Sequence, residues 1–431
     1  MGSSTSRGTM RNVSLTATAL LSAALLAPVG TATAAAETCQ GQAATIVGTP
    51  GGQITGTEGA DVIVTNGAMR VDALGGDDRV CATGEDPTFG RSVFAILGAG
   101  ADTFIDPRGG QHVIYAGTND GPDNVVAPDS TDTGADVIRS SGYSLVRSGM
   151  AGQPNADIID LASGEVSWSG IQTAPGAVSV GTGGILGVRS ANGDVTMDAS
   201  GTVIGADTAL TWTGRFDRLV FTTSAERGRF TFRGTGGTER VKVDAPMTFD
   251  RDIALGGGKD SYESNSLGGK STRIKGDGGR NQLLLELGSQ SRVRADLSRS
   301  RVTATKAGVT DAIRVRGFDD LIVTAKRADV IGTDRANEIG VIACRTSVNG
   351  KKGRDYLYVD SKYSGLGSWV TPRCANYTST IYGGPGNDGL AGSGIGDDRL
   401  IGGPGKDSVS GGWAGRDVCQ GERVRNCEKR I

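Results

Sequence analysis

The sequence predicts an all-β protein, a parallel β-helix or β-solenoid that is followed by a short parallel β-roll. Glycine accounts for 70 of the 431 residues, about 16 % against a typical ~7 %, while aromatic residues account for 5 %. This composition favours many turns and short strands over one large close-packed core. Degenerate copies of a nine-residue pattern recur along the chain, and helical periodicity is hard to find after the first 36 residues.

Residues 1–36 are predicted to be a secretory signal peptide. Arg7 and Arg11 precede a predominantly apolar run, Leu15–Ala27, which is too short for a stable membrane anchor. Small residues around Ala34 form a cleavage site. The sequence has no second apolar run of eighteen residues, so we expect a secreted, extracellular protein with no membrane span.

Charge and cysteine content limit the classes of function. The chain has 45 basic and 47 acidic side chains, and removing the two signal arginines leaves 43 − 47, a net charge of −4. No basic footprint for nucleic acid is present. Six cysteines, all beyond the signal, suit an oxidising compartment. They allow fifteen pairings, and their positions suggest three local ones: Cys39–Cys81, Cys344–Cys374 and Cys419–Cys427.

Residues 37–380 are predicted to form the β-solenoid, with calcium ligands that have mostly decayed. Degenerate copies of the pattern place these residues at its sixth position: Asp61, Asp102, Asp157, Glu239, Asp260, Asn281, Asn337 and Asp355. Stacked rungs would bury a narrow core of valine, isoleucine and leucine, and glycine would form the corners. The alternative is a string of β-sandwich domains.

Spacing supports the solenoid. The steps from Glu239 to Asp260 and from Asp260 to Asn281 are both 21 residues, a period that suits one rung of a parallel β-helix. The step from Asp102 to Asp123 is also 21, but other steps differ, so the repeat is irregular or loops interrupt it. The acidic segment 119–136 is either a second calcium site or a solvated loop.

The most regular copies occupy residues 381–421. Four units have aspartate at position six and an apolar residue at position eight: Asp388 with Leu390, Asp398 with Leu400, Asp407 with Val409, and Asp417 with Cys419. The aspartates lie ten, nine and ten residues apart because Gly392 and Gly411 are single extra residues. Residues 422–431 are expected to form a capping tail.

Residue types in these units suit a calcium site. Glycine permits the positive φ of a tight turn and lets backbone carbonyls face an ion. Calcium prefers six to eight oxygen ligands, and each turn would supply carbonyls and one aspartate. Because turns alternate between two edges, we expect Asp388 to lie with Asp407, and Asp398 with Asp417.

The stretch resembles the hemolysin-type (RTX) calcium-binding repeat family, whose pattern is G-G-x-G-x-D-x-U-x. That resemblance implies bound calcium and the carbonyls of positions two and four as ligands beside the aspartate. The metal ligands it implies are Gly384, Gly386, Asp388, Gly394, Gly396, Asp398, Gly403, Gly405, Asp407, Gly415 and Asp417. Ser393 at position one and Trp413 at position two depart from the pattern.

These observations predict a secreted, non-enzymatic, calcium-binding repeat protein. We expect it to fold in a calcium-dependent way and to serve in surface association, matrix structure or adhesion, with cell-surface or matrix polysaccharide as partner. The alternative is a calcium-dependent polysaccharide lyase on a parallel β-helix, by analogy of fold alone. A Ser-His-Asp catalytic triad would have to use His112, because it is the single histidine. His112 lies in a strand-like run and is expected to have a structural role.

Overall fold

The computed structural model describes residues 36–117, 134–360, 372, 374–413 and 415–431. Within these ranges the chain is all-β, as predicted, and contains no helix. Residues Glu37–Ile431 form one compact unit. No helix in the described ranges has the length and apolarity that crossing a membrane would require.

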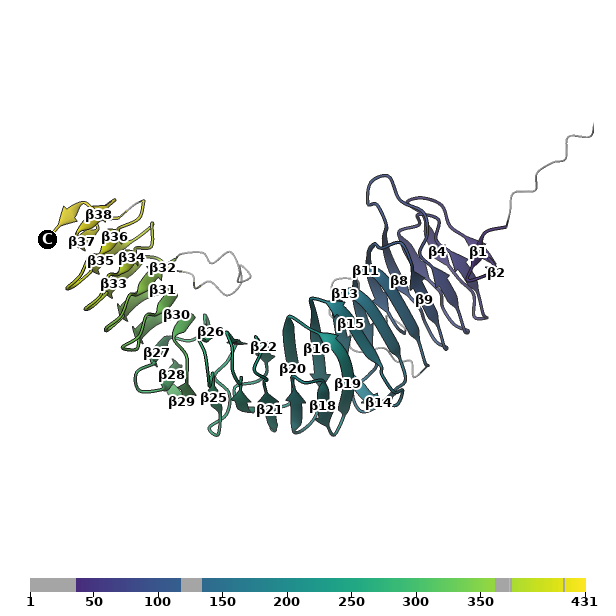
Figure 1. Ribbon diagram of the computed structural model, residues 1–431, viewed down its shortest axis with the longest axis horizontal. Coiled ribbons are helices and arrows are strands. Elements are labelled where there is room, and N and C mark those ends of the chain that lie inside the picture. The colour runs from purple at the N-terminus through teal and green to yellow at the C-terminus, as the bar shows by residue number, and fades with distance from the viewer. Residues whose placement is uncertain (1–35, 118–133, 361–371, 373, 414) are drawn as a thin grey trace, which may run out of the picture. The chain divides into compact units, whose positions relative to one another are not determined.

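Short strands follow one another along the chain, separated by turns (Figure 1). The first twenty are β1 (Thr38–Cys39), β2 (Gln42–Ala43), β3 (Ile46–Val47), β4 (Gln53–Thr55), β5 (Val62–Val64), β6 (Arg70–Asp72), β7 (Arg79–Cys81), β8 (Ser92–Ile96), β9 (Thr103–Asp106), β10 (Gln111–Tyr115), β11 (Val137–Ser148), β12 (Pro154–Asn155), β13 (Ile158–Trp168), β14 (Gly170–Gln172), β15 (Val178–Thr182), β16 (Gly184–Ser190), β17 (Val195–Asp198), β18 (Thr202–Gly205), β19 (Thr208–Arg215) and β20 (Arg218–Thr223). The others are β21 (Arg229–Arg233), β22 (Arg240–Asp244), β23 (Asp250–Ala254), β24 (Ser261–Ser264), β25 (Arg273–Lys275), β26 (Gln282–Glu286), β27 (Arg292–Asp296), β28 (Arg301–Lys306), β29 (Val309–Arg316), β30 (Asp320–Ile331), β31 (Glu338–Asn349), β32 (Tyr356–Val359), β33 (Thr378–Tyr382), β34 (Gly389–Ala391), β35 (Asp397–Ile401), β36 (Ser408–Ser410), β37 (Val418–Gln420), β38 (Arg423–Arg425) and β39 (Lys429–Arg430).

Most strands pair in parallel with the strand two places further along the chain, which gives a solenoid-like arrangement. In the middle of the chain Val241 pairs with Tyr262, and Tyr262 with Leu283, so each step is 21 residues as predicted. The step is 17 residues near the N-terminus, where Ile63 pairs with Val80, and 19 near the C-terminus. The same pairing continues across residue 380, because β33 pairs with both β31 and β35.

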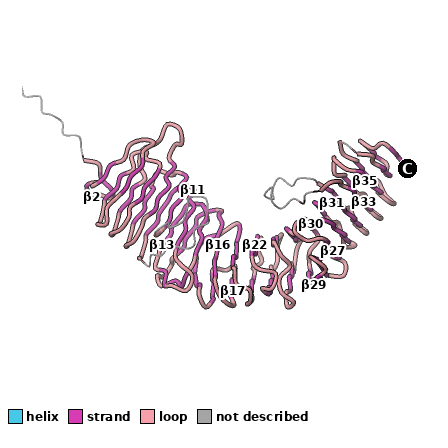
Figure 2. Tube along the Cα trace, turned by 180° about the vertical axis from the view of Figure 1, so that it is seen from behind, coloured by secondary structure: helices cyan, strands magenta, loops and turns pink. Residues whose placement is uncertain are grey.

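Alternation along each strand places one set of side chains inside the stack, as the pleat of a strand requires. Most buried apolar side chains form one core that runs from Ile54 to Cys419, and Cys39, Val64 and Cys81 form a second, smaller cluster. The large core includes aromatic rings, with Phe221 stacked on Phe230 at 4.2 Å between ring centroids. Figure 2 shows strands along the whole described chain, with turns between them.

Two antiparallel insertions interrupt the parallel pairing. Strands β17, β18 and β19 form the first, and β27, β28 and β29 form the second. Each adds residues between two rungs, so the register from β25 to β29 is 41 residues instead of 21. A period count in the sequence does not reveal such insertions.

All three predicted disulfides are present. They join Cys39 to Cys81, Cys344 to Cys374, and Cys419 to Cys427, with Cα–Cα separations of 5.6, 5.3 and 6.1 Å. Disulfides persist in oxidising environments, so the bonds indicate such an environment for this chain.

Candidate metal centre

Stacked acidic side chains run along one edge of the C-terminal rungs and form the first ladder: Asp355, Asp388, Asp407 and Glu422. The main-chain N–H of Asp355 donates to Oδ1 of Asp388 at 2.8 Å, and that of Asp388 donates to Oδ1 of Asp407 at 2.9 Å. The N–H of Asp407 donates to Oε2 of Glu422 at 2.7 Å. Each carboxylate therefore holds the preceding turn through one of its two oxygens.

A second ladder occupies the other edge: Ser379, Asp398, Asp417 and Glu428. The Asp398 N–H donates to Oδ1 of Asp417 at 2.9 Å, and the Asp417 N–H donates to Oε2 of Glu428 at 2.5 Å. The structure thus brings Asp388 together with Asp407, and Asp398 together with Asp417, as the alternation of turns predicted. Members of a pair lie 19 residues apart, one above the other on the same edge.

Local sequence explains why the ladders form. The apolar residue at position eight points inward in every unit, and Leu390, Leu400, Val409 and Cys419 are all at most 2 % exposed. The extra residues Gly392 and Gly411 both fall on the second edge, so they lengthen the turns before Asp398 and Asp417 equally and keep these two rungs in register.

Glycine is required where the turns stack. A Cβ added at Gly383 would lie 2.5 Å from Oδ2 of Asp388, so the carboxylate occupies the space that a side chain would fill. A Cβ at Gly405 would overlap the carbonyl oxygen of Gly386, and a Cβ at Gly386 would overlap that of Gly353. Carbonyl oxygens of position four therefore form a column beside the first ladder.

The second oxygen of each aspartate in the first ladder is buried and has no hydrogen-bond partner in the described structure: Oδ2 of Asp355, Asp388 and Asp407. Burial raises the pKa of the Asp355 carboxyl to about 6. Burial also raises the pKa of Asp388 and of Asp407, and the adjacent charges of Asp407 and Glu422, respectively, raise them further. Buried carboxylates without donors are costly unless a cation or proton offsets them.

These groups fit calcium better than a metal that needs nitrogen or sulfur ligands. In the described residues, no group of three or more His, Cys, Asp or Glu side chains could hold a metal ion. A metal here would therefore need backbone carbonyl oxygens to complete its shell. Calcium accepts such mixed carboxylate and carbonyl oxygen sets.

On the second edge, the Asp398 carboxylate already has protein hydrogen-bond donors on both oxygens. The other oxygen of Asp398 accepts the N–H of Ser393 at 2.6 Å and the Ser393 hydroxyl at 3.1 Å, and its Oδ1 accepts the Ser379 hydroxyl at 2.6 Å. Protein donors already satisfy this carboxylate. Trp413, which departs from the pattern, is 94 % exposed.

In an upstream turn, threonine donors satisfy an aspartate in the way that serine donors satisfy Asp398. The N–H and hydroxyl of Thr57 donate to Oδ2 of Asp61 at 2.7 and 2.9 Å. Although burial raises the pKa of Asp61, these hydrogen bonds and one from Thr45 give a net lowering. Threonine or serine donors thus satisfy both oxygens of the carboxylate in Asp61 and Asp398, but not in Glu239, where both Thr235 donors bind Oε1 and Oε2 has no hydrogen-bond partner.

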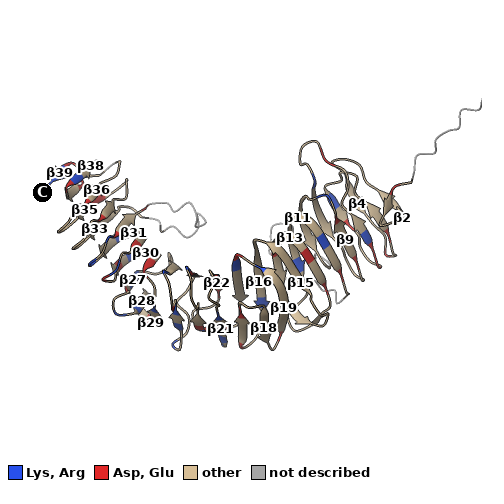
Figure 3. Ribbon diagram, in the orientation of Figure 1, with Lys and Arg blue, Asp and Glu red and all other residues tan. Residues whose placement is uncertain are grey.

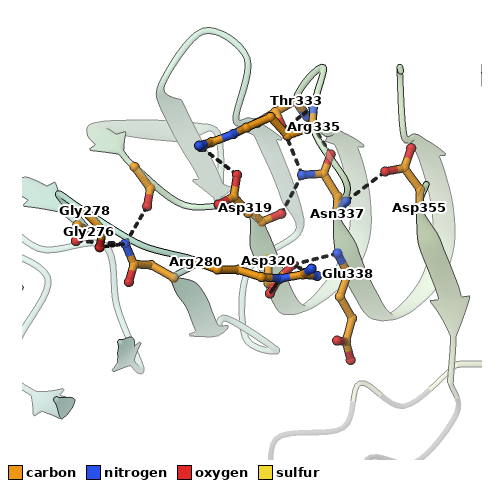
Figure 4. Close-up of polar contacts among 12 residues, drawn as sticks. Gly276, Gly278, Arg280, Asp319, Asp320, Thr333, Arg335, Asn337, Glu338 and Asp355 are labelled. Carbon is orange, nitrogen blue, oxygen red and sulfur yellow. Dashed lines mark hydrogen bonds and ion pairs between the residues drawn. The ribbon is translucent and has the colours of Figure 1, made fainter. Parts of the chain in front are cut away.

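All eight residues predicted at position six of the degenerate copies are buried and lie in such ladders. Figure 4 shows one example, in which the Asn337 N–H donates to Oδ1 of Asp355 at 2.8 Å and its side-chain amide donates to the Asp319 carbonyl at 2.7 Å. Asn281 shows that asparagine can replace aspartate as the acceptor in a ladder, because its Oδ1 accepts the Asp260 N–H at 3.0 Å.

The N-terminal ladder departs from the predicted spacing. The Asp102 N–H donates to Oδ1 of Asp136, 34 residues along the chain, so the 21-residue step to Asp123 does not define this rung. Asp123 and most of the acidic segment 119–136 lie outside the described residues. Asp78, which the irregular spacing left out, joins the ladder through Oδ1, to which the Asp61 N–H donates at 2.8 Å.

Sequence reasoning missed Glu422 and Glu428, which complete the two ladders. They follow Asp407 and Asp417 by 15 and 11 residues, outside the nine-residue pattern, and the longer glutamate side chain spans the shortened turn. An acidic residue just before each of the last two strands was the available signal.

The single histidine is buried and paired. Nε2 of His112 lies 2.9 Å from Oδ2 of Asp106, and both side chains are almost fully buried. Burial lowers the pKa of His112, although Asp106 opposes that shift. This pair fits the structural role expected for the residue.

In comparisons with known proteins, no family model matches this chain, and no curated protein matches it either.

Proposed function

We propose that the protein is a secreted, non-enzymatic, calcium-binding β-solenoid protein whose C-terminal rungs form a calcium-binding parallel β-roll. The observation that carries this proposal is the row of buried, unpartnered carboxylate oxygens on Asp355, Asp388 and Asp407. A row of buried negative charges beside carbonyl oxygens suits a divalent cation that favours oxygen ligands.

The first ladder would hold the ion. Asp388 and Asp407 would contribute carboxylate oxygens. The glycines Gly384, Gly386, Gly403 and Gly405 would contribute carbonyl oxygens. Bound calcium would supply positive charge between stacked carboxylates. The ladder hydrogen bonds would still position each turn, since they use the other oxygen of each aspartate.

Calcium would bind the second edge more weakly, because Ser393 and Ser379 already donate to Asp398. This ranking distinguishes sites that the repeat pattern alone treats as equal. Gly394, Gly396, Gly415 and Asp417 of that edge would accordingly be weaker ligands.

Export would place the protein where calcium is plentiful. Three disulfides and the signal-like residues 1–36 support secretion. Calcium would then stabilise residues 381–421 outside the cell, and the stabilised stack would serve in surface association, matrix structure or adhesion.

Calorimetric titration of the mature protein with calcium tests the proposal, together with protease digestion of the tail. We expect binding with a dissociation constant on the order of 10⁻⁴–10⁻³ M, as in extracellular modules, and a tail that resists protease in calcium but not in chelator. Equal digestion in chelator and in millimolar calcium would refute the calcium-driven function.

A further inference from the structure

The second antiparallel insertion carries an unusual surface. Strands β28 and β29 form a hairpin in which Arg301 pairs with Arg314, and β29 also pairs with β25, so that Arg314 lies beside Arg273. These three arginines are exposed and form one row across three adjacent strands. Adjacent strands lie about 4.8 Å apart, so the row places positive charges at close, regular intervals.

A second row runs next to the first. Lys275 pairs with Arg316 two positions along the same strands, and both are exposed. The Val315 N–H donates to the Ser300 carbonyl at 3.0 Å, which brings the turn residue Arg299 close to Arg316. Like charges directly opposite on a sheet are destabilising, so these two rows of basic side chains do not contribute to the stability of the fold.

Carboxylates do not neutralise the first row. In the described structure Arg273, Arg301 and Arg314 form no ion pair with an acidic side chain. The acidic residues that flank the row have other partners. Asp252 lies 3.1 Å from Arg233, and Asp296 lies 3.6 Å from Arg299.

The first row and Arg316 of the second row line a hollow of about 750 Å³, while Lys275 lies outside that lining. Its basic residues are Lys270, Arg273, Arg299, Arg301, Arg314 and Arg316, and we call this surface the basic groove. Serine, threonine, alanine and isoleucine complete the lining, with no aromatic residue among the described residues that line it. Figure 3 shows basic residues on β28 and β29.

We propose that the basic groove binds an acidic polysaccharide that carries carboxylates on successive sugars. Arginine recognises planar carboxylates with paired hydrogen bonds. A regular row of such side chains along the stack suits an extended polymer with regularly spaced charges. Single-stranded nucleic acid fits less well, because its binding sites combine positive charge with aromatic stacking platforms.

The compartment and the other insertion support this assignment. Three disulfides place the chain where extracellular polysaccharides occur. The insertion β17–β19 has the same antiparallel construction but no comparable arginine row. The charge therefore belongs to the second insertion and not to insertions in general, and this binding is separate from the calcium site.

Binding of the full mature chain to polygalacturonate tests the proposal, with dextran as the neutral comparison, by affinity electrophoresis at low salt. Chelator is present throughout, so the result does not depend on calcium binding. The groove variant is Arg273→Gln with Arg314→Gln. Its matched control is Arg215→Gln with Arg227→Gln, which removes the same charge from two exposed arginines outside the groove.

We expect the wild type to bind polygalacturonate and not dextran. The groove variant should bind at least about tenfold more weakly, because it loses two charge-assisted contacts, while the control should bind as the wild type does. The groove variant should melt no lower than the wild type, since it removes like-charge neighbours. The proposal fails if the wild type does not bind, if the control loses as much affinity as the groove variant, or if single-stranded DNA binds more tightly than polygalacturonate.

Discussion

The main-chain N–H of Asp388 donates a 2.9 Å hydrogen bond to Oδ1 of Asp407, while Oδ2 of Asp407 is buried and has no hydrogen-bond partner in the described structure. One carboxylate thus has two separable roles. The first oxygen fixes the neighbouring turn, and the second places a buried negative charge against Gly402, the first glycine of its own turn. Substitutions can remove one role and keep the other.

Asp407→Asn and Asp407→Ala should separate folding from calcium binding. Asparagine keeps an acceptor for the Asp388 N–H, as Asn281 does for the Asp260 N–H elsewhere in the chain, but it removes the buried charge. We expect the asparagine variant to resist protease in chelator better than the wild type, and to gain little from calcium. The alanine variant should also lose the hydrogen bond, at about 1–3 kcal/mol for the unsatisfied N–H.

Asp397→Asn is the control for these variants, because Asp397 is exposed and its carboxylate accepts the main-chain N–H of Arg416 and pairs with the Arg416 guanidinium, outside the two ladders. Its calcium affinity by calorimetry should match that of the wild type. If Asp407→Asn binds calcium as tightly as the wild type does, the first ladder is not the metal site.

Gly405→Ala should be strongly destabilising in the C-terminal rungs. Gly405 has φ +156°, and an added Cβ would overlap the carbonyl oxygen of Gly386. Backbone strain alone is worth about 1–3 kcal/mol. Gly236→Ala is the matched control, because a Cβ there meets nothing within 4 Å and Gly236 has no positive φ. Comparable loss of protease resistance in both variants would contradict the stacking argument.

Much of the fold could be predicted from repeat positions whose residues have the same structural role in every rung. The inward position eight and the aspartate at position six depend only on near neighbours in sequence, so the pattern reveals them. The cysteine pairs could be predicted because each joins cysteines that follow one another along the chain. The step of 21 residues was correct for Glu239, Asp260 and Asn281, where no insertion intervenes.

What could not be predicted depends on packing between distant segments. The Asp102 N–H donates to Asp136, 34 residues along the chain, so the 21-residue step does not set this contact. The second antiparallel insertion places Arg314 between Arg273 and Arg301, and no period in the sequence indicates that three-strand contact. Closure of Asp398 by Ser393 required side-chain geometry that spacing does not supply.

Asp78→Asn should change how stability depends on pH. Burial raises the pKa of Asp78 to about 6, the neighbouring charges of Asp61 and Asp77 raise it further, and a hydrogen bond from the Asp61 N–H opposes the rise. Between about pH 4 and 6 the folded protein retains a proton that the unfolded chain has released, so its free energy of unfolding falls as pH rises through this window.

Asparagine resembles the protonated form and accepts the same N–H, so Asp78→Asn should match the wild type near pH 5 and melt at a higher temperature at pH 7. Thermal unfolding of both proteins in chelator, taken as a difference at each pH, cancels the contribution of other groups such as His112. A difference in melting temperature that is the same at pH 5 and pH 7 would show that the Asp78 proton is not coupled to folding.

Removing the Cys419–Cys427 disulfide should release both ladders at their C-terminal ends. Glu422 lies inside the eight-residue separation that the bond closes, and Glu428 follows it directly. Closing so short a loop is worth about 2–3 kcal/mol through the unfolded state. The double serine variant should therefore be cleaved by protease after β37, with weaker calcium binding because Asp407 loses the acceptor for its N–H. Removing Cys344–Cys374 instead should leave β38 and β39 protected, and peptide mapping of the digests distinguishes the two outcomes. Full protection of β38 and β39 without the Cys419–Cys427 bond would mean that the Glu422 and Glu428 hydrogen bonds suffice to hold the last rung.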